Sequence, residues 1–166
     1  MRKILVRITF FCCFFIVAAF AWAQIRKAGL WELTTTTTWQ QSPFPAGSPA
    51  TLGSSPHTIQ VCLTQEEIDK YGAIMPRTGR GCQITNIVKK PGGMTADMVC
   101  SGGTMTGKGS LESTSTDNEH AKGHIHFVGA MQMGQNSKPM EWSSVSTSFY
   151  KGADCGSVKP FPMPDK

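Results

Sequence analysis

Four cysteines constrain the fold of this 166-residue chain more than any other feature: Cys62, Cys82, Cys100 and Cys155. A small domain with paired cysteines and few large aliphatic side chains is typical of proteins that fold in an oxidising compartment. Four cysteines allow three pairings, and no Cys-x-x-Cys motif indicates a redox-active pair. We therefore expect two structural disulfides.

The segment from Cys82 to Cys100 selects one of these pairings. Lys90-Pro91-Gly92-Gly93 is a turn signal between two strand-like runs. A hairpin centred on Pro91 sets Cys82 opposite Cys100, Ile84 opposite Met98, Asn86 opposite Ala96 and Val88 opposite Met94. One face is then mostly apolar, and a slip by one residue would lose that separation. The register predicts a Cys82–Cys100 disulfide, which leaves Cys62 to pair with Cys155.

The first 23 residues have the three parts of a secretory signal. Residues 1–7 hold three basic side chains, residues 8–20 are mostly apolar, and Ala21-Trp22-Ala23 is a small-x-small cleavage site. A retained membrane anchor is the alternative, but the apolar run is short for a bilayer span. We expect cleavage before Gln24, a periplasmic or secreted location, and no membrane span after cleavage.

Signal removal lowers the formal net charge from +5 to +2, because three basic residues and no acidic residue are lost. Nucleic-acid binding needs a basic face on the folded domain, and the remaining charges do not predict one. We expect a monomer with no nucleic-acid partner. The remaining length suits a single β domain over residues 24–157, followed by a proline-rich tail over residues 158–166.

Alternating side chains predict successive strands with one helix between them. Residues 30–39 and 59–63 alternate as strands, and the proline-rich residues 40–56 between them predict a flexible loop. Thr64-Gln65-Glu66-Glu67 has the form of a capping box, so a short helix should begin there and end near Tyr71. Residues 104–113 predict a further strand, although Gly107 and Gly109 weaken it.

A second hairpin register follows from the turn at Asp117-Asn118. Centred on Asn118, it sets Ile125 opposite Leu111 and places Phe127 over Gly109. A last strand is expected over residues 141–150. The strands are joined by short turns and do not alternate with helices, which indicates an all-β antiparallel meander. We expect a curled sheet or partly open barrel of about six to eight strands with one short helix. A two-sheet sandwich is the alternative.

Several short motifs occur in a characteristic order: Gly29-Leu30-Trp31-Glu32-Leu33-Thr34, Cys62-Leu63-Thr64, Cys82, Cys100, Met105-Thr106-Gly107-Lys108-Gly109 and Gly152-Ala153-Asp154-Cys155. In this order they resemble the exported bacterial family known as domain of unknown function 3617. The resemblance covers nearly all of the chain after the signal. It implies a periplasmic, disulfide-bonded β domain, and it brings no established activity, catalytic residue or cofactor.

Histidines offer the best candidate metal ligands. His124 and His126 share one face of a strand, and the second hairpin register sets Glu112 opposite His124. Two imidazoles and a carboxylate suit zinc or copper. The competing interpretation is a solvated outer face, because Ile125 and its neighbour Phe127 take the inner face. We prefer the solvated face and keep a periplasmic metal-binding protein as an alternative.

No catalytic motif is present, so we expect neither an enzyme nor a cofactor. Residues 102–108 match the start of a phosphate-binding loop, but Gly109 stands where a serine or threonine should ligate magnesium. The leading hypothesis is a binding module for a small apolar ligand or an envelope partner, with Trp31, Trp39 and Trp142 lining a cavity in the curled sheet. The competing interpretation, which we prefer for the tryptophans themselves, is that they form the core. A structural envelope protein without a ligand is the third possibility.

Overall fold

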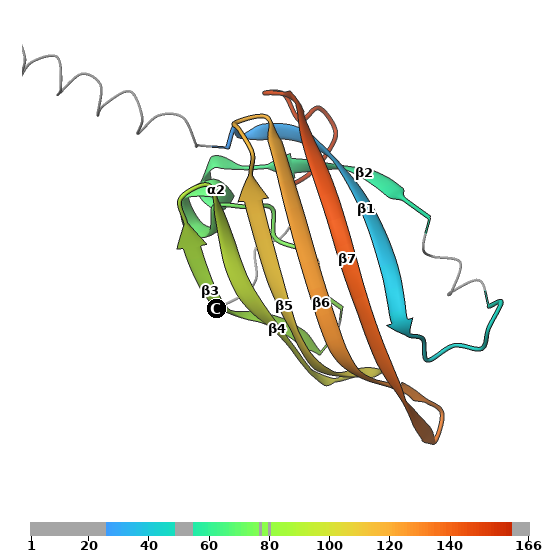
Figure 1. Ribbon diagram of the computed structural model, residues 1–166. Coiled ribbons are helices and arrows are strands. Elements are labelled where there is room, and N and C mark those ends of the chain that lie inside the picture. The colour runs from blue at the N-terminus through green and yellow to red at the C-terminus, as the bar shows by residue number, and fades with distance from the viewer. Residues whose placement is uncertain (1–25, 49–54, 77, 80, 161–166) are drawn as a thin grey trace, which may run out of the picture.

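The computed structural model describes residues 26–48, 55–76, 78–79 and 81–160 (Figure 1). The expected signal over residues 1–23 and the end of the proline-rich tail lie outside these residues. The elements are β1 (Gly29–Gln41), β2 (His57–Leu63), α2 (Gln65–Tyr71), β3 (Cys82–Lys90), β4 (Gly93–Gly102), β5 (Met105–Ser115), β6 (His120–Met133) and β7 (Asn136–Gly152). No helix among the described residues is long and apolar enough to cross a bilayer.

The strands form one antiparallel sheet of seven in the order β2-β1-β7-β6-β5-β4-β3. Strands β3 to β7 follow one another as a meander, and β1 then pairs with β7. The sheet curls strongly but stays open, with β2 and β3 at its edges (Figure 1). The predicted all-β meander with one short helix is therefore confirmed, and the described residues form no two-sheet sandwich.

The β3–β4 hairpin confirms the predicted register over its first half. Cys82 pairs with Cys100 and Ile84 pairs with Met98, as expected. The second half of the hairpin differs from the predicted register. A bulge between Thr85 and Val88 shifts the register by one, so Val88 pairs with Thr95 instead of Met94. Asn86 takes a positive φ of 51° at this bulge, and its side-chain amide donates to the Asp97 carboxylate over 2.7 Å instead of lying opposite Ala96.

The β5–β6 hairpin has the predicted register throughout. Leu111 pairs with Ile125, and Gly109 pairs with Phe127. The Phe127 ring is fully buried over Gly109 and its neighbours, and a Cβ added to Gly129 would lie 2.8 Å from the ring. The glycines that weaken the strand pattern therefore leave room for a fully buried aromatic ring.

Strand ends differ from the expectation mainly where strands pair on both sides. β7 is longer than the predicted 141–150, because it is hydrogen-bonded to β6 along one edge and to β1 along the other. β1 likewise runs to Gln41, inside the expected loop over residues 40–56. Residues 49–54 of that loop lie outside the described residues. At the other end of the domain, Pro160 forms a bridge to Cys62.

The helix begins as its capping box predicts. The Thr64 hydroxyl accepts from the Glu67 backbone N–H, and the Glu67 carboxylate accepts from the Thr64 backbone N–H over 2.8 Å. Gly72 ends the helix in the left-handed conformation. We call the described residues between β2 and β3, namely 64–76, 78–79 and 81, the cover segment.

The cover segment buries the inner face of the sheet, the face that holds the core. Tyr71, Ala73 and Met75 join one apolar cluster with the inward side chains of β4, β5 and β6. Ile68 joins a second cluster with Trp31, Val61 and Leu63. One segment therefore links the two ends of an open sheet that has no second sheet to pack on.

Two disulfides fix both ends of the cover segment. Cys62 lies just before it and bonds to Cys155 across 93 residues of sequence. Cys82 lies just after it and bonds to Cys100 across 18 residues. Both predicted pairings are confirmed.

The longer disulfide loop should contribute more to stability. The chain-entropy model assigns about 4.7 kcal/mol to a loop of 100 residues and about 3 kcal/mol to one of 15. We expect the C62S/C155S variant to lose about 1.5 kcal/mol more free energy of unfolding than the C82S/C100S variant. Urea unfolding followed by tryptophan fluorescence measures both. A larger loss in C82S/C100S would contradict the prediction.

Candidate functional site

A cavity of about 240 Å³ lies between the middle of the sheet and the cover segment. Its wall is formed mainly by inward side chains of β1, β2, β4, β5, β6 and β7, and by Ile74, Met75 and Pro76 of the cover segment. Glu112, Lys122 and His124 also border the cavity, although they are exposed. Arg26, just before β1, completes the wall. The cavity thus joins every part of the fold except β3 and α2.

Small side chains create the hollow. Gly123 of β6 and Ser144, Ser146 and Ser148 of β7 follow one another along the inner face at the middle of the sheet. The two apolar clusters flank this strip with bulky side chains that do not fill it. The inner face of the sheet therefore has a shallow depression between the two apolar clusters.

The rest of the wall is mainly aliphatic. Leu33, Ile74 and Ile125 line the cavity and remain partly exposed, although Leu33 and Ile125 lie on the inner face. Ile59 on the edge strand β2 is 37% exposed. Apolar side chains on the inner face of a sheet normally pack against other protein atoms, so their exposure here marks an incompletely filled pocket.

Arg26 is the one buried basic side chain among the described residues and is only 3% exposed. Its Nε donates to Oγ of Ser115 over 3.2 Å, and its Nη2 donates to Oγ of Ser113 over 3.3 Å. The guanidinium also lies 5.7 Å from the centre of the Trp31 ring. Burial lowers the pKa of Arg26 to about 10, so it still carries its charge at neutral pH.

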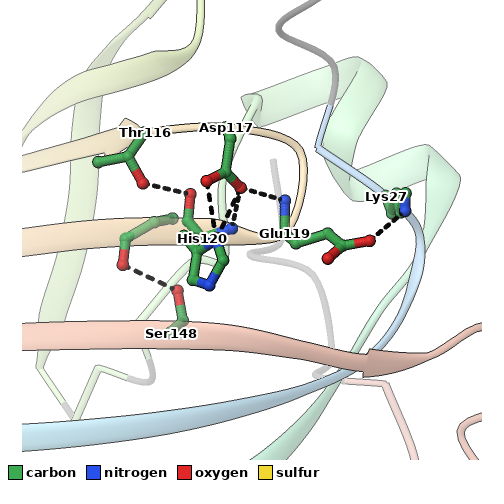
Figure 2. Close-up of polar contacts among 7 residues, drawn as sticks. Lys27, Thr116, Asp117, Glu119, His120 and Ser148 are labelled. Carbon is green, nitrogen blue, oxygen red and sulfur yellow. Dashed lines mark hydrogen bonds and ion pairs between the residues drawn. The ribbon is translucent and has the colours of Figure 1, made fainter.

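The residue after Arg26 fixes this arrangement to the β5–β6 turn (Figure 2). Lys27 forms an ion pair with Glu119, and this hydrogen bond raises the pKa of Lys27. The Lys27 carbonyl accepts from Nε1 of Trp31 over 2.9 Å. Lys27 therefore joins the start of β1 to a turn that lies about ninety residues away in sequence.

The turn itself is organised by Asp117 (Figure 2). Its carboxylate accepts from the backbone N–H groups of Glu119 and His120, both over 2.7 Å, and contacts Nδ1 of His120. These contacts, with the Glu119 N–H the largest cause, hold the pKa of Asp117 below its usual range.

The three tryptophans expected to line a cavity lie outside the wall of this one. Trp31 is fully buried in the second apolar cluster and packs edge-on against Tyr150. Trp39 pairs with Trp142 across β1 and β7, and Trp142 stacks on Phe127. All three pack with core clusters at the ends of the cavity. The core interpretation of the tryptophans thus fits the structure better.

The histidines lie on the outer face of the sheet, as the register predicts. His124 pairs with Glu112, and both side chains are exposed. His126 instead contacts the Glu141 carboxylate on β7, with Nε2 and Oε1 3.1 Å apart. Within the described ranges, no group of three or more histidine, cysteine, aspartate or glutamate side chains is arranged to hold a metal ion. The structure gives the zinc or copper hypothesis no support.

Arg26 is the residue that sequence reasoning missed. Its position just before the first strand gives no periodic signal, and its serine partners lie 87 and 89 residues further along the chain. The adjacent basic pair Arg26-Lys27, next to a strand, was the available clue.

One family model matches the chain, over residues 26–155, and is described as "Protein of unknown function (DUF3617)". The match covers the whole sheet and both disulfides, and it confirms the resemblance carried by the motifs. No curated protein matches the chain, and no solved structure does.

The Asp117 turn should make stability depend on pH in the acid range. A carboxylate whose pKa is lowered on folding contributes stability above its unfolded pKa of about 3.9 and loses it as the pH falls through the folded value. We expect Asp117→Asn to destabilise the protein at pH 7 and to matter progressively less below pH ~4. Urea unfolding of both proteins from pH 7 to pH 2.5 tests this. A stability difference independent of pH would contradict it.

Proposed function

Because this chain belongs to the DUF3617 family, whose function is unknown, we propose a function from its own cavity. The protein is an exported, non-catalytic module that binds a small apolar ligand between the sheet and the cover segment. The observation that carries this proposal is the aliphatic wall of Leu33, Ile59, Ile74 and Ile125, which stays partly exposed on the inner side of the fold.

Physical chemistry favours an apolar occupant for such a wall. Removal of apolar surface from water contributes about 0.8 kcal/mol for each CH₂ group that is buried. The cavity is somewhat smaller than the about 300–1,000 Å³ typical of pockets for drug-sized molecules. The ligand should therefore be a small molecule or a short hydrocarbon chain.

The polar groups of the cavity support binding rather than catalysis. The Ser144 hydroxyl is hydrogen-bonded to Thr37, and the Ser148 hydroxyl donates to the Ala121 carbonyl. The Ser113 hydroxyl accepts from Arg26. None of these hydroxyls contacts an imidazole or a carboxylate in the described part of the chain, so no activated nucleophile is assembled here.

Export supports the same proposal, because both disulfides require an oxidising compartment to form. We expect the full chain, expressed in a Gram-negative host, to appear in the periplasmic fraction. Its intact mass should correspond to a chain that begins at Gln24 and lacks four hydrogen atoms because of the two disulfides. Retention of the whole chain in the membrane fraction would contradict the export signal.

Filling the cavity tests the proposed binding directly. Ser146 faces the hollow, whereas its neighbour Thr147 faces the outer side of the same strand. We expect Ser146→Phe to reduce binding of the neutral apolar probe octan-1-ol at least tenfold, because the ring occupies the ligand's space. Isothermal titration calorimetry measures the affinity.

Thr147→Phe is the matched control, since it adds the same ring to the same strand on the other face. It should bind octan-1-ol like the original protein. The proposal fails if the original protein shows no saturable binding, or if both variants bind as the original does. Native mass spectrometry of protein from its own host then distinguishes a copurified apolar molecule from a metal ion or a protein partner.

A further inference from the structure

The buried Arg26 bears on which class of apolar ligand the cavity takes. A guanidinium carries five N–H donors and no acceptor. Nε and Nη2 of Arg26 each donate to one serine hydroxyl, and Nη1 donates to no group in the described residues. Hydroxyls are neutral acceptors, so the charge itself has no counter-charge in these contacts.

No carboxylate in the described part of the chain forms an ion pair with Arg26. The ion pairs among the described residues involve Lys27, His120, His126 and Lys151, and none involves Arg26. Glu112 borders the cavity, but it is exposed and alternates along β5 with the inward Leu111 and Ser113. Its carboxylate therefore belongs to the outer face of the sheet.

Arg26 borders the cavity with a guanidinium whose Nη1 has no hydrogen-bond partner among the described residues. Among the described residues, every fully buried side-chain nitrogen or oxygen has a hydrogen-bond partner. Since Nη1 has none, it is not sealed in the protein, and Arg26 is part of the cavity wall. An incoming acceptor can therefore reach it without displacing a protein contact.

Neighbouring contacts hold the guanidinium in place before any ligand arrives. The Trp31 ring, the two serine hydroxyls and the Lys27–Glu119 pair fix Arg26 from different elements. A charged donor that is already oriented loses little entropy on binding, and arginine favours the planar, two-oxygen geometry of a carboxylate.

We propose that the cavity selects an amphiphilic anion, a carboxylate on a short hydrocarbon body, with Arg26 binding the carboxylate. This inference rests on the proposed apolar binding site and names its ligand class. Leu33, Ile59, Ile74 and Ile125 hold the hydrocarbon, and Nη1 of Arg26 donates to the carboxylate. The serine contacts of Nε and Nη2 remain in place.

Three probes of equal chain length test the proposal on the unmodified protein: octanoate, octan-1-ol and octylamine, which is cationic at pH 7.4. A hydrogen bond to a charged group corresponds to an affinity ratio of about ten- to hundredfold. We expect octanoate to bind tighter than octan-1-ol by that factor, and octylamine to bind weakest. Isothermal titration calorimetry measures the three affinities, with each probe kept below its critical micelle concentration or solubility limit.

Two variants assign the effect to Arg26. Arg26→Met should reduce the ratio of the octanoate affinity to the octan-1-ol affinity to about one, because the thioether side chain carries no charge and donates no hydrogen bond. Arg26→Lys should keep part of the preference, because the charge remains but the planar fork is lost. The wild-type comparison decides the question even if one variant folds poorly.

The outcomes separate the two proposals. Equal affinity of the unmodified protein for octanoate and octan-1-ol overturns the role of Arg26 and leaves the apolar binding site intact. A preference for octanoate that persists in Arg26→Met also overturns it. Failure of all three probes to bind overturns the apolar site and, with it, the inference about Arg26.

Discussion

The fold depends on how one segment is held against the inner face of an open sheet. A seven-stranded sheet without a second sheet needs another layer to bury its apolar side chains. The cover segment is that layer, but α2 has only seven residues and would be marginal by itself. Disulfides through Cys62 and Cys82 fix the two ends of the segment to distant strands. The covalent bonds thus compensate for a small helix and a thin core.

The same arrangement creates the cavity. Bulky residues fill the two ends of the inner face, where the cover segment packs closely through Ile68 and Tyr71. At the middle of the sheet, Gly123 and Ser146 leave a dip that Ile74 and Met75 close only in part. Substituting larger aliphatic residues along this strip would extend the core and remove the pocket. The choice of small residues therefore decides that the domain has a cavity rather than a continuous core.

Much of the fold could be predicted because its signals are local. The two hairpin registers, the Cys82–Cys100 disulfide and the capping box each follow from turns and alternation within about twenty residues. The Cys62–Cys155 disulfide follows only by elimination, once Cys82 and Cys100 are paired. The bulge at Asn86 was missed, because an inserted residue is compatible with the same turn and the same disulfide. The cavity depends on β1 lying beside β7, a pairing across more than a hundred residues. No periodic pattern in one sequence encodes such a contact, so neither the true wall nor Arg26 could be found that way.

The proposed binding of an anionic ligand gives a physical reason for the buried charge of Arg26 that a contribution to stability does not. A buried guanidinium loses its hydration, and two serine hydroxyls replace only part of it. An apolar side chain of similar volume next to Trp31 would avoid that cost. Replacement of a buried ion pair by apolar side chains is often neutral or stabilising for the same reason. The protein nevertheless positions this charge with three side-chain contacts, and Nη1 has no hydrogen-bond partner among the described residues. A structural cation would be expected beside a carboxylate, whereas a cation that awaits an anionic ligand must lack one.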